Sequence, residues 1–87
     1  IVLECIPKKL GACISKNLKV PTIGIGAGLD TDGQVLVLHD MIGVDPAFSP
    51  KFLRKYANTN ELITDALDKF HDDVRSERFP APMETYE

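Results

Sequence analysis

Glu4 is the residue of this sequence best placed to do chemistry. It interrupts the apolar run Ile1–Cys5, and a run of this kind is typical of a parallel strand buried on both faces. A buried carboxylate is costly unless it is partnered or takes part in a reaction, and burial raises its affinity for a proton, as a general base requires. We therefore expect Glu4 to be a catalytic base near the carboxyl end of a strand. A structural salt bridge to a Lys or Arg of the same sheet is the alternative.

Three glycines at alternate positions, Gly24, Gly26 and Gly28, form a second feature. Bare backbone at a strand end can approach a ligand or pack closely against another segment. The dinucleotide fingerprint needs Gly where Leu29 stands, and the Lys-Ser/Thr pair of a phosphate-binding P-loop is missing. We expect these glycines to serve packing, with ligand contact as the alternative.

Several polar residues remain as weaker candidates. The segment Asp30–Gly33 resembles the start of a calcium loop, but the sixth position is Val35 and the twelfth is Met41, so we reject a calcium site. The pair His39-Asp40 follows an apolar run and is either a metal ligand or a local hydrogen-bonded pair, the second being our expectation. His71 is expected on a solvated helix face.

The elements that carry these residues follow from apolar spacing. Pro7 ends the first strand and starts an amphipathic helix of about three turns, which stops at Asn17 and Pro21. A second buried strand is expected over Thr22–Ile25, which completes a β-α-β unit. A loop at residues 26–34 then leads to a third strand at Val35–Leu38.

Two helices are predicted in the second half. Ser49 is a good N-cap for a short helix over Pro50–Tyr56. Asn60 caps a longer helix that ends near Arg78 and carries one apolar stripe. The stripe consists of Ile63, Ala66, Leu67, Phe70 and Val74.

Composition restricts the possible functions. The chain has 87 residues, of which 44% are hydrophobic and 26% charged, and its net charge is −3. No apolar run approaches the ~20 residues that span a bilayer, and no cluster of Lys and Arg suits nucleic acid, so we expect neither membrane nor nucleic acid as a partner. Cys5 and Cys13 fit no redox, metal or disulfide pattern, and we interpret them as free thiols of a cytoplasmic protein.

The order strand, helix, strand, loop, strand, helices predicts the α/β class with a parallel sheet. Helices on only one side leave the other face of such a sheet bare. A (β/α)₈ barrel needs about 250 residues, so we expect this chain to be the C-terminal third of one. Residues 1–78 would supply the last three strand units and the C-terminal helices, and residues 79–87 a surface tail. The first residues already read as mid-strand, so we expect a piece of a longer protein.

The sequence resembles the C-terminal part of ketopantoate hydroxymethyltransferases, enzymes of pantothenate biosynthesis. The likeness rests on Leu3-Glu4-Cys5, on the run from Ile23 to Asp40, on Pro50-Lys51-Phe52 and on Phe79-Pro80. It extends in order over essentially the whole chain.

The resemblance implies a (β/α)₈ enzyme that transfers a hydroxymethyl group from methylenetetrahydrofolate to alpha-ketoisovalerate, uses magnesium and assembles as a homo-oligomer. It implies that Glu4 is the base that removes the proton next to the ketone. It also implies that the magnesium-binding acids, and most contacts to the substrate carboxylate, lie on earlier strands outside these 87 residues. The expected partners are therefore a small keto acid, a folate and further copies of the chain.

Two other functions remain open. The 87-residue chain could be a catalytically inactive structural or oligomerising piece, which the missing metal ligands favour for the isolated polypeptide. It could also belong to a different barrel enzyme that binds a phosphorylated ligand at the glycine-rich rim. A Lys or Arg near that loop would favour the last reading, and residues 24–33 contain none.

Overall fold

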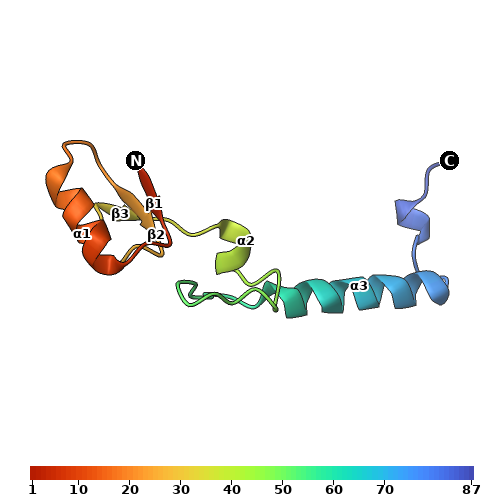
Figure 1. Cartoon of the computed structure of the whole chain (residues 1–87). Helices are drawn as coiled ribbons and strands as arrows, with labels where there is room; N and C mark the ends of the chain where they lie inside the picture. The colour runs from red at the N-terminus through yellow and green to blue at the C-terminus, as the bar shows by residue number, and fades with distance from the viewer.

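The computed structural model describes all 87 residues and shows a small sheet followed by an extended arm (Figure 1). The sheet consists of β1 (Val2–Glu4), β2 (Ile23–Ile25) and β3 (Gly33–Gln34). The strand order is β1-β2-β3, and both neighbouring pairs are parallel. The predicted α/β class with parallel strands is therefore confirmed.

Helix α1 (Lys8–Asn17) connects β1 to β2, as predicted. Pro7 precedes its first residue, and the Pro7 carbonyl accepts hydrogen bonds from the amides of Leu10 and Gly11, each at 3.0 Å. The far end of the helix is tied to the start of β2 by a 2.7 Å hydrogen bond between the hydroxyls of Ser15 and Thr22. The predicted β-α-β unit is thus present.

The third strand lies earlier in the chain than predicted. β3 covers Gly33–Gln34, and the prediction of a strand at Val35–Leu38 was wrong. Pairing with β2 ends after the Val35 amide, which donates to the Gly24 carbonyl at 3.0 Å. Because β2 turns away at Gly26, whose φ is +67°, the following residues have no strand beside them in this chain. The chain instead forms the short helix α2 (Leu38–Met41).

The helix predicted over Pro50–Tyr56 is also absent. The segment forms one turn, with the Leu53 amide donating to the Pro50 carbonyl at 3.0 Å, and otherwise runs as a loop. Its backbone is engaged elsewhere, because the Tyr56 amide donates to the Met41 carbonyl at 2.7 Å. A seven-residue helix gains too little from its own hydrogen bonds to compete with such contacts.

The arm beyond this loop is helix α3 (Thr59–Arg75) followed by a short 3₁₀ helix, η1 (Pro82–Glu84). Helix α3 begins two residues earlier than predicted, because the side chain of Asn60 donates to the Val44 carbonyl at 3.2 Å and does not cap the helix. It ends three residues before the predicted Arg78. Phe79 then folds back, and its ring packs edge-on against Phe70 at 5.3 Å between centroids.

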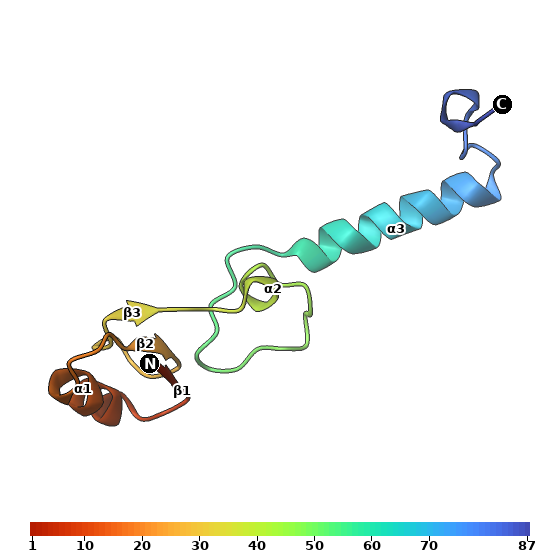
Figure 2. The same ribbon diagram turned by 90° about the horizontal axis from the view of Figure 1, so that it is seen from above.

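The chain buries very little of itself. Its extents are 66 × 28 × 14 Å, and the arm projects away from the sheet in both views (Figures 1 and 2). Only six residues are buried, all of them small: Gly11, Thr22, Gly24, Ala27, Thr31 and Gly43. Strands buried on both faces were predicted, and within this chain that prediction was wrong, since Val2 is 63% exposed.

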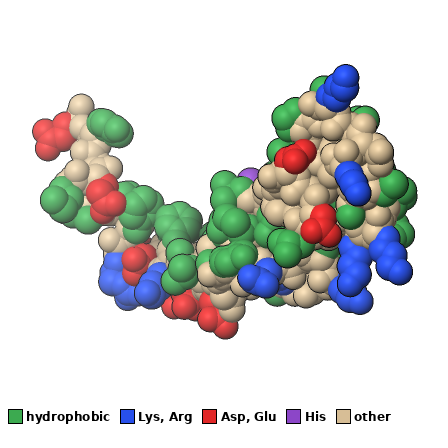
Figure 3. Space-filling model, turned by 90° about the vertical axis from the view of Figure 1, so that its left-hand side faces the viewer, with side chains coloured by type: hydrophobic (Ala, Val, Ile, Leu, Met, Phe, Trp, Pro, Cys, Tyr) green, Lys and Arg blue, Asp and Glu red, His purple; other side chains and the backbone are tan.

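The apolar stripe predicted on α3 is present and uncovered. Ile63, Leu67, Phe70 and Val74 are each between 44% and 62% exposed. Figure 3 shows hydrophobic side chains along the arm, with charged side chains at its lower edge. None of the helices is both long and apolar enough to cross a membrane.

Candidate active site

Glu4 occupies the last position of β1, at the carboxyl edge of the sheet. It lies opposite Ile25, the last residue of β2, and the next amide, that of Cys5, donates to the Ile25 carbonyl at 2.9 Å. The two strands therefore end at the same level. The predicted position of Glu4 at a carboxyl strand end is confirmed.

The register also fixes the face on which Glu4 lies. Side chains alternate along a strand, so Val2 and Glu4 share one face of the sheet with Ile23 and Ile25, their partners in β2. No helix of this chain covers that face. The opposite face carries Gly24, and a Cβ added there would meet Ala27 and Thr31.

Glu4 is exposed, so its predicted burial was wrong for this chain. The physical reason is that β1 is an edge strand of three residues, with β2 as its only neighbour in this chain. The structural alternative, a salt bridge, is likewise not formed within the chain. The one ion pair of this chain joins Arg78 to Asp73 at 3.0 Å.

Two of the three glycines serve close packing. A Cβ on Gly24 would lie 2.7 Å from the hydroxyl oxygen of Thr31, and a Cβ on Gly28 would lie 2.6 Å from the Cβ of Lys8. A side chain at either position would push apart segments that now touch. The glycine-rich strand end therefore lets the loop after β2 lie against the start of α1, in agreement with the packing interpretation.

Asp32, in the segment first compared with a calcium loop, has a structural role. Its carboxylate accepts hydrogen bonds from the amide of Thr22 at 2.7 Å and from the Thr22 hydroxyl at 3.1 Å. Nearby, the Gln34 side chain donates to the Gly28 carbonyl at 2.8 Å. The Asp32 bonds hold the loop between β2 and β3 against the start of β2, and the Gln34 bond joins that loop to β3.

A hollow of about 530 Å³ lies at the carboxyl ends of β1 and β2, and we call it the rim hollow. Its lining includes Cys5, Lys8, Gly26, Gly28, Lys51 and Phe52. Because Gly26 has no side chain, Phe52 can lie close to its backbone. A Cβ on this glycine would lie 3.2 Å from Cγ of Phe52. The hollow adjoins the strand end that carries Glu4.

The sequence did not predict that Lys8, Lys51 and Phe52 would line this hollow. No Lys or Arg lies within residues 24–33, yet two lysines reach the same rim from distant segments. One available signal was that Lys8 starts the helix that follows β1, because such a helix begins at the edge where its strand ends. Nothing local indicated that Lys51 and Phe52 would return there.

His39 and Asp40 lie within α2, so their predicted position at a strand end was wrong. His39 is exposed, and no hydrogen bond joins its side chain to that of Asp40. The structure therefore does not form the expected local pair. His71 is exposed on α3, as predicted.

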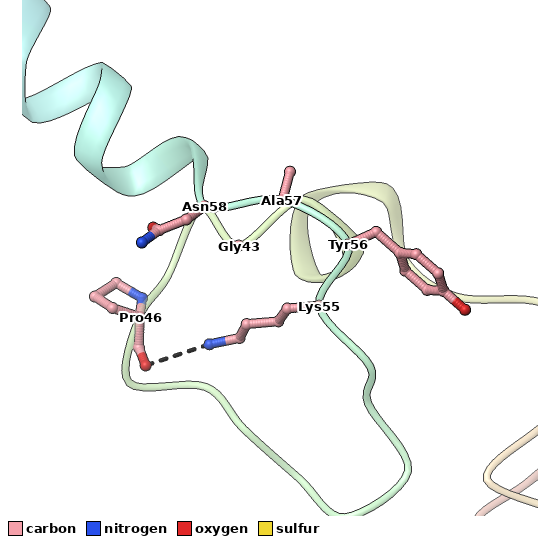
Figure 4. A pocket seen from close by; sticks show the side chains of 6 residues that line it. All are labelled: Gly43, Pro46, Lys55, Tyr56, Ala57 and Asn58. Carbon is pink, nitrogen blue, oxygen red and sulfur yellow. Dashed lines mark hydrogen bonds between the residues drawn. The ribbon is translucent and has the colours of Figure 1, made fainter.

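A second hollow, of about 480 Å³, lies in the loop between α2 and α3. The ammonium group of Lys55 donates to the carbonyls of Asp45 and Pro46, both at 3.3 Å, and so bridges the two sides of the loop. Figure 4 shows Lys55 reaching toward Pro46 while the ring of Tyr56 points away. These contacts close the loop on itself and bring no reactive side chains together.

The carboxylates and other metal-ligating side chains of this chain do not form a metal site by themselves. Nowhere do three His, Cys, Asp or Glu side chains come close enough to hold an ion. Magnesium prefers several oxygen ligands in octahedral geometry. The residues present therefore do not fit a magnesium site.

Similarity to known proteins identifies the family of this chain, which the geometry alone does not. The model of the family described as ketopantoate hydroxymethyltransferase matches residues 1–82. A 3-methyl-2-oxobutanoate hydroxymethyltransferase of Parabacteroides distasonis is 52% identical over 86 residues, which are 99% of this chain and 32% of that protein. This chain belongs to the ketopantoate hydroxymethyltransferase family.

Further family members are similar to the same extent. The proteins of that name from Bdellovibrio bacteriovorus and Geobacillus kaustophilus are 50% and 48% identical over 86 residues, again 99% of this chain. The chain covers 33% and 31% of those two proteins. It therefore spans about a third of the length of the curated relatives it matches.

Proposed function

We propose that this chain is the C-terminal third of a ketopantoate hydroxymethyltransferase, an enzyme that transfers a hydroxymethyl group from methylenetetrahydrofolate to alpha-ketoisovalerate. The observation that supports this most strongly is identity near 50% with enzymes of that name over nearly the whole chain. The parallel sheet, with Glu4 at its carboxyl edge, agrees with the chemistry.

In this proposal Glu4 is the catalytic base. Its carboxylate removes the proton from the carbon next to the ketone, and the electron pair of that C–H bond moves into the enolate. Water releases the methylene group from the two nitrogens of methylenetetrahydrofolate at the oxidation level of formaldehyde, and tetrahydrofolate leaves. The enolate carbon then forms the new C–C bond to this one-carbon unit, whose oxygen takes up a proton and becomes the hydroxyl. Glu4 suits this role because it makes no ion pair in the chain and lies at a strand end, where barrel enzymes carry their reactive groups.

The complete protein would be a (β/α)₈ barrel. Three parallel strands with one uncovered face and unpaired edges match a segment of such a sheet. The face that carries Val2, Glu4, Ile23 and Ile25 would then line the barrel interior. Closure would supply the burial of Glu4 that this chain lacks.

The remaining features of the proposed enzyme are its metal, its assembly and its location in the cell. Magnesium would be held by ligands on earlier strands, outside these 87 residues. The uncovered stripe of α3 is a surface for packing, either on the rest of the barrel or on further copies in a homo-oligomer. The two free, exposed thiols Cys5 and Cys13 suit the reducing conditions of the cytoplasm.

The isolated 87-residue chain would be inactive by the same reasoning. It holds no group of metal-ligating side chains, and its large apolar residues lie at the surface. For this polypeptide alone, a structural or oligomerising role is the second candidate function.

The assay is ketopantoate formation by the purified full-length protein, with magnesium present. We expect product only when alpha-ketoisovalerate and methylenetetrahydrofolate are both supplied, and none from the 87-residue chain. A folded full-length protein that forms no ketopantoate with both substrates would contradict the proposal.

A further inference from the structure

The rim hollow has an unusual charge for a chain of net charge −3. Lys8 and Lys51 line it, and no Asp or Glu does. Neither lysine takes part in an ion pair, because the chain's one salt bridge lies at Arg78. Two unpartnered cations beside one hollow favour an anionic ligand.

The rest of the lining of the rim hollow consists of apolar side chains and glycines. Phe52 is half-buried and lies over Gly26, where the missing side chain leaves room for its ring. Aromatic rings bind the flat faces of ligand rings, and lysines bind carboxylates or phosphates. The hollow therefore combines a surface for a ring with two positions for negative charge.

Of the two proposed substrates, only the folate has both features. Alpha-ketoisovalerate has one carboxylate and no ring. A folate carries an aminobenzoyl ring joined to a glutamate, whose carboxylates extend away from the reactive methylene group. A hollow of about 530 Å³ is within the roughly 300–1,000 Å³ range of ligand pockets.

We propose that the rim hollow binds the aminobenzoyl-glutamate tail of the folate co-substrate, with Lys8 and Lys51 on its carboxylates and Phe52 on its ring. This rests on the proposed function, since it takes methylenetetrahydrofolate as the one-carbon donor. It adds three binding residues that lie beside the strand end of Glu4. The tail would hold the one-carbon donor at the edge of the sheet where the enolate forms.

The decisive experiment measures equilibrium binding to the full-length protein. The probes are p-aminobenzoyl-glutamate and its triglutamate form, titrated by calorimetry into the parent and the double variant Lys8→Gln/Lys51→Gln. We expect the Kd to rise at least about tenfold, the usual effect of losing a charge-assisted hydrogen bond. We expect the parent to bind the triglutamate, which carries more carboxylates, more tightly than the monoglutamate, and the double variant to lose this preference.

Two further variants sharpen the result. Lys9→Gln removes the neighbouring charge of α1, which does not line the rim hollow, and should leave the Kd of both probes unchanged. Phe52→Leu should weaken both probes by a similar factor without changing the triglutamate preference, because it removes only the ring contact. Unchanged Kd values in the double variant, or equal losses in Lys9→Gln, would overturn the proposal.

A separate readout distinguishes this proposal from the proposed function. Exchange of the proton next to the ketone of alpha-ketoisovalerate in deuterated water, without folate, reports the keto-acid step alone. We expect the double variant to keep that exchange while losing folate affinity. If it instead slows exchange and raises the KM for the keto acid, the hollow serves the keto-acid carboxylate and the folate assignment is wrong. If the parent catalyses no exchange and forms no ketopantoate, the proposed function itself fails.

Discussion

Thr22 links three segments of the chain through one buried hydroxyl. It is fully buried, bonds Ser15 of α1 at 2.7 Å and, with its own amide, holds the Asp32 carboxylate at 2.7 and 3.1 Å. No apolar residue of similar size can replace these bonds. A single polar residue therefore ties both α1 and the loop before β3 to the start of β2.

We predict that Thr22→Val lowers the free energy of unfolding of the full-length protein by about 1–3 kcal/mol, because it removes the part-buried hydrogen bonds that the Thr22 hydroxyl makes to Ser15 and Asp32. Denaturant unfolding measures the change. The control is Thr85→Val, which removes an exposed hydrogen bond and should change stability by less than about 0.5 kcal/mol. Equal effects of the two substitutions would contradict this account.

At the residue scale, the sequence predicted where Glu4 lies but not what surrounds it. An apolar run interrupted by one carboxylate is a local pattern, so the position at a strand end followed from it. The predicted burial failed because it needs strands on both sides of β1, and in this chain β1 has β2 alone beside it. Lys51 and Phe52 were missed because they reach the rim only through the path of a long loop.

At the scale of elements, the sequence correctly predicted those helices and strands that depend mainly on their own apolar spacing. Helix α1, β2 and α3 follow from apolar spacing and are present within one to three residues of their predicted bounds. The helix expected over Pro50–Tyr56 failed because long-range bonds from Lys55 and Tyr56 determine that segment. β3 lies earlier in the chain than predicted because its pairing with β2 ends where β2 turns away.

The contact between α1 and the loop after β2 gives a prediction at this scale. Gly28 has a φ of +86°, and a Cβ on it would lie 2.6 Å from the Cβ of Lys8. We expect Gly28→Ala to lower the free energy of unfolding of the full-length protein by about 1–3 kcal/mol, from backbone strain together with the clash. Thermal unfolding measures it.

Gly33→Ala is the matched control for that substitution. The φ of Gly33 is not positive, and a Cβ added to this residue would meet only the flexible Cδ1 of Ile23. The loss of stability should be clearly smaller than for Gly28→Ala. If Gly28→Ala left stability unchanged, the packing role assigned to the glycine-rich strand end would be wrong.

At the scale of the whole molecule, the elements present do not enclose a core. Six small residues are buried, while the stripe on α3 and one face of the sheet are uncovered. The sequence predicted parallel strands and a bare sheet face, and both are present in a chain that spans about a third of the length of its curated relatives. Closure into a barrel stays a prediction.

We predict that the isolated 87-residue chain is not a stable, compact monomer. Three parallel strands with unpaired edges, and an arm with an exposed apolar stripe, bury too little surface to offset the conformational entropy of folding. Analytical ultracentrifugation and calorimetric melting test this. A monomer that sediments as a compact particle and melts in one cooperative transition would contradict it.

The central claim is that Glu4 is the base of a ketopantoate hydroxymethyltransferase, and proton exchange tests it most directly. The full-length protein and its Glu4→Gln variant are incubated with alpha-ketoisovalerate in deuterated water without folate. Exchange next to the ketone is followed by NMR. Glutamine keeps the shape of the side chain but cannot accept the proton, so we predict exchange slowed by roughly 10²–10⁴-fold with melting unchanged. If Glu4 were half of a buried salt bridge, the variant would instead lose about 3–5 kcal/mol of stability. A folded variant that exchanges the proton at the parent rate would contradict the claim.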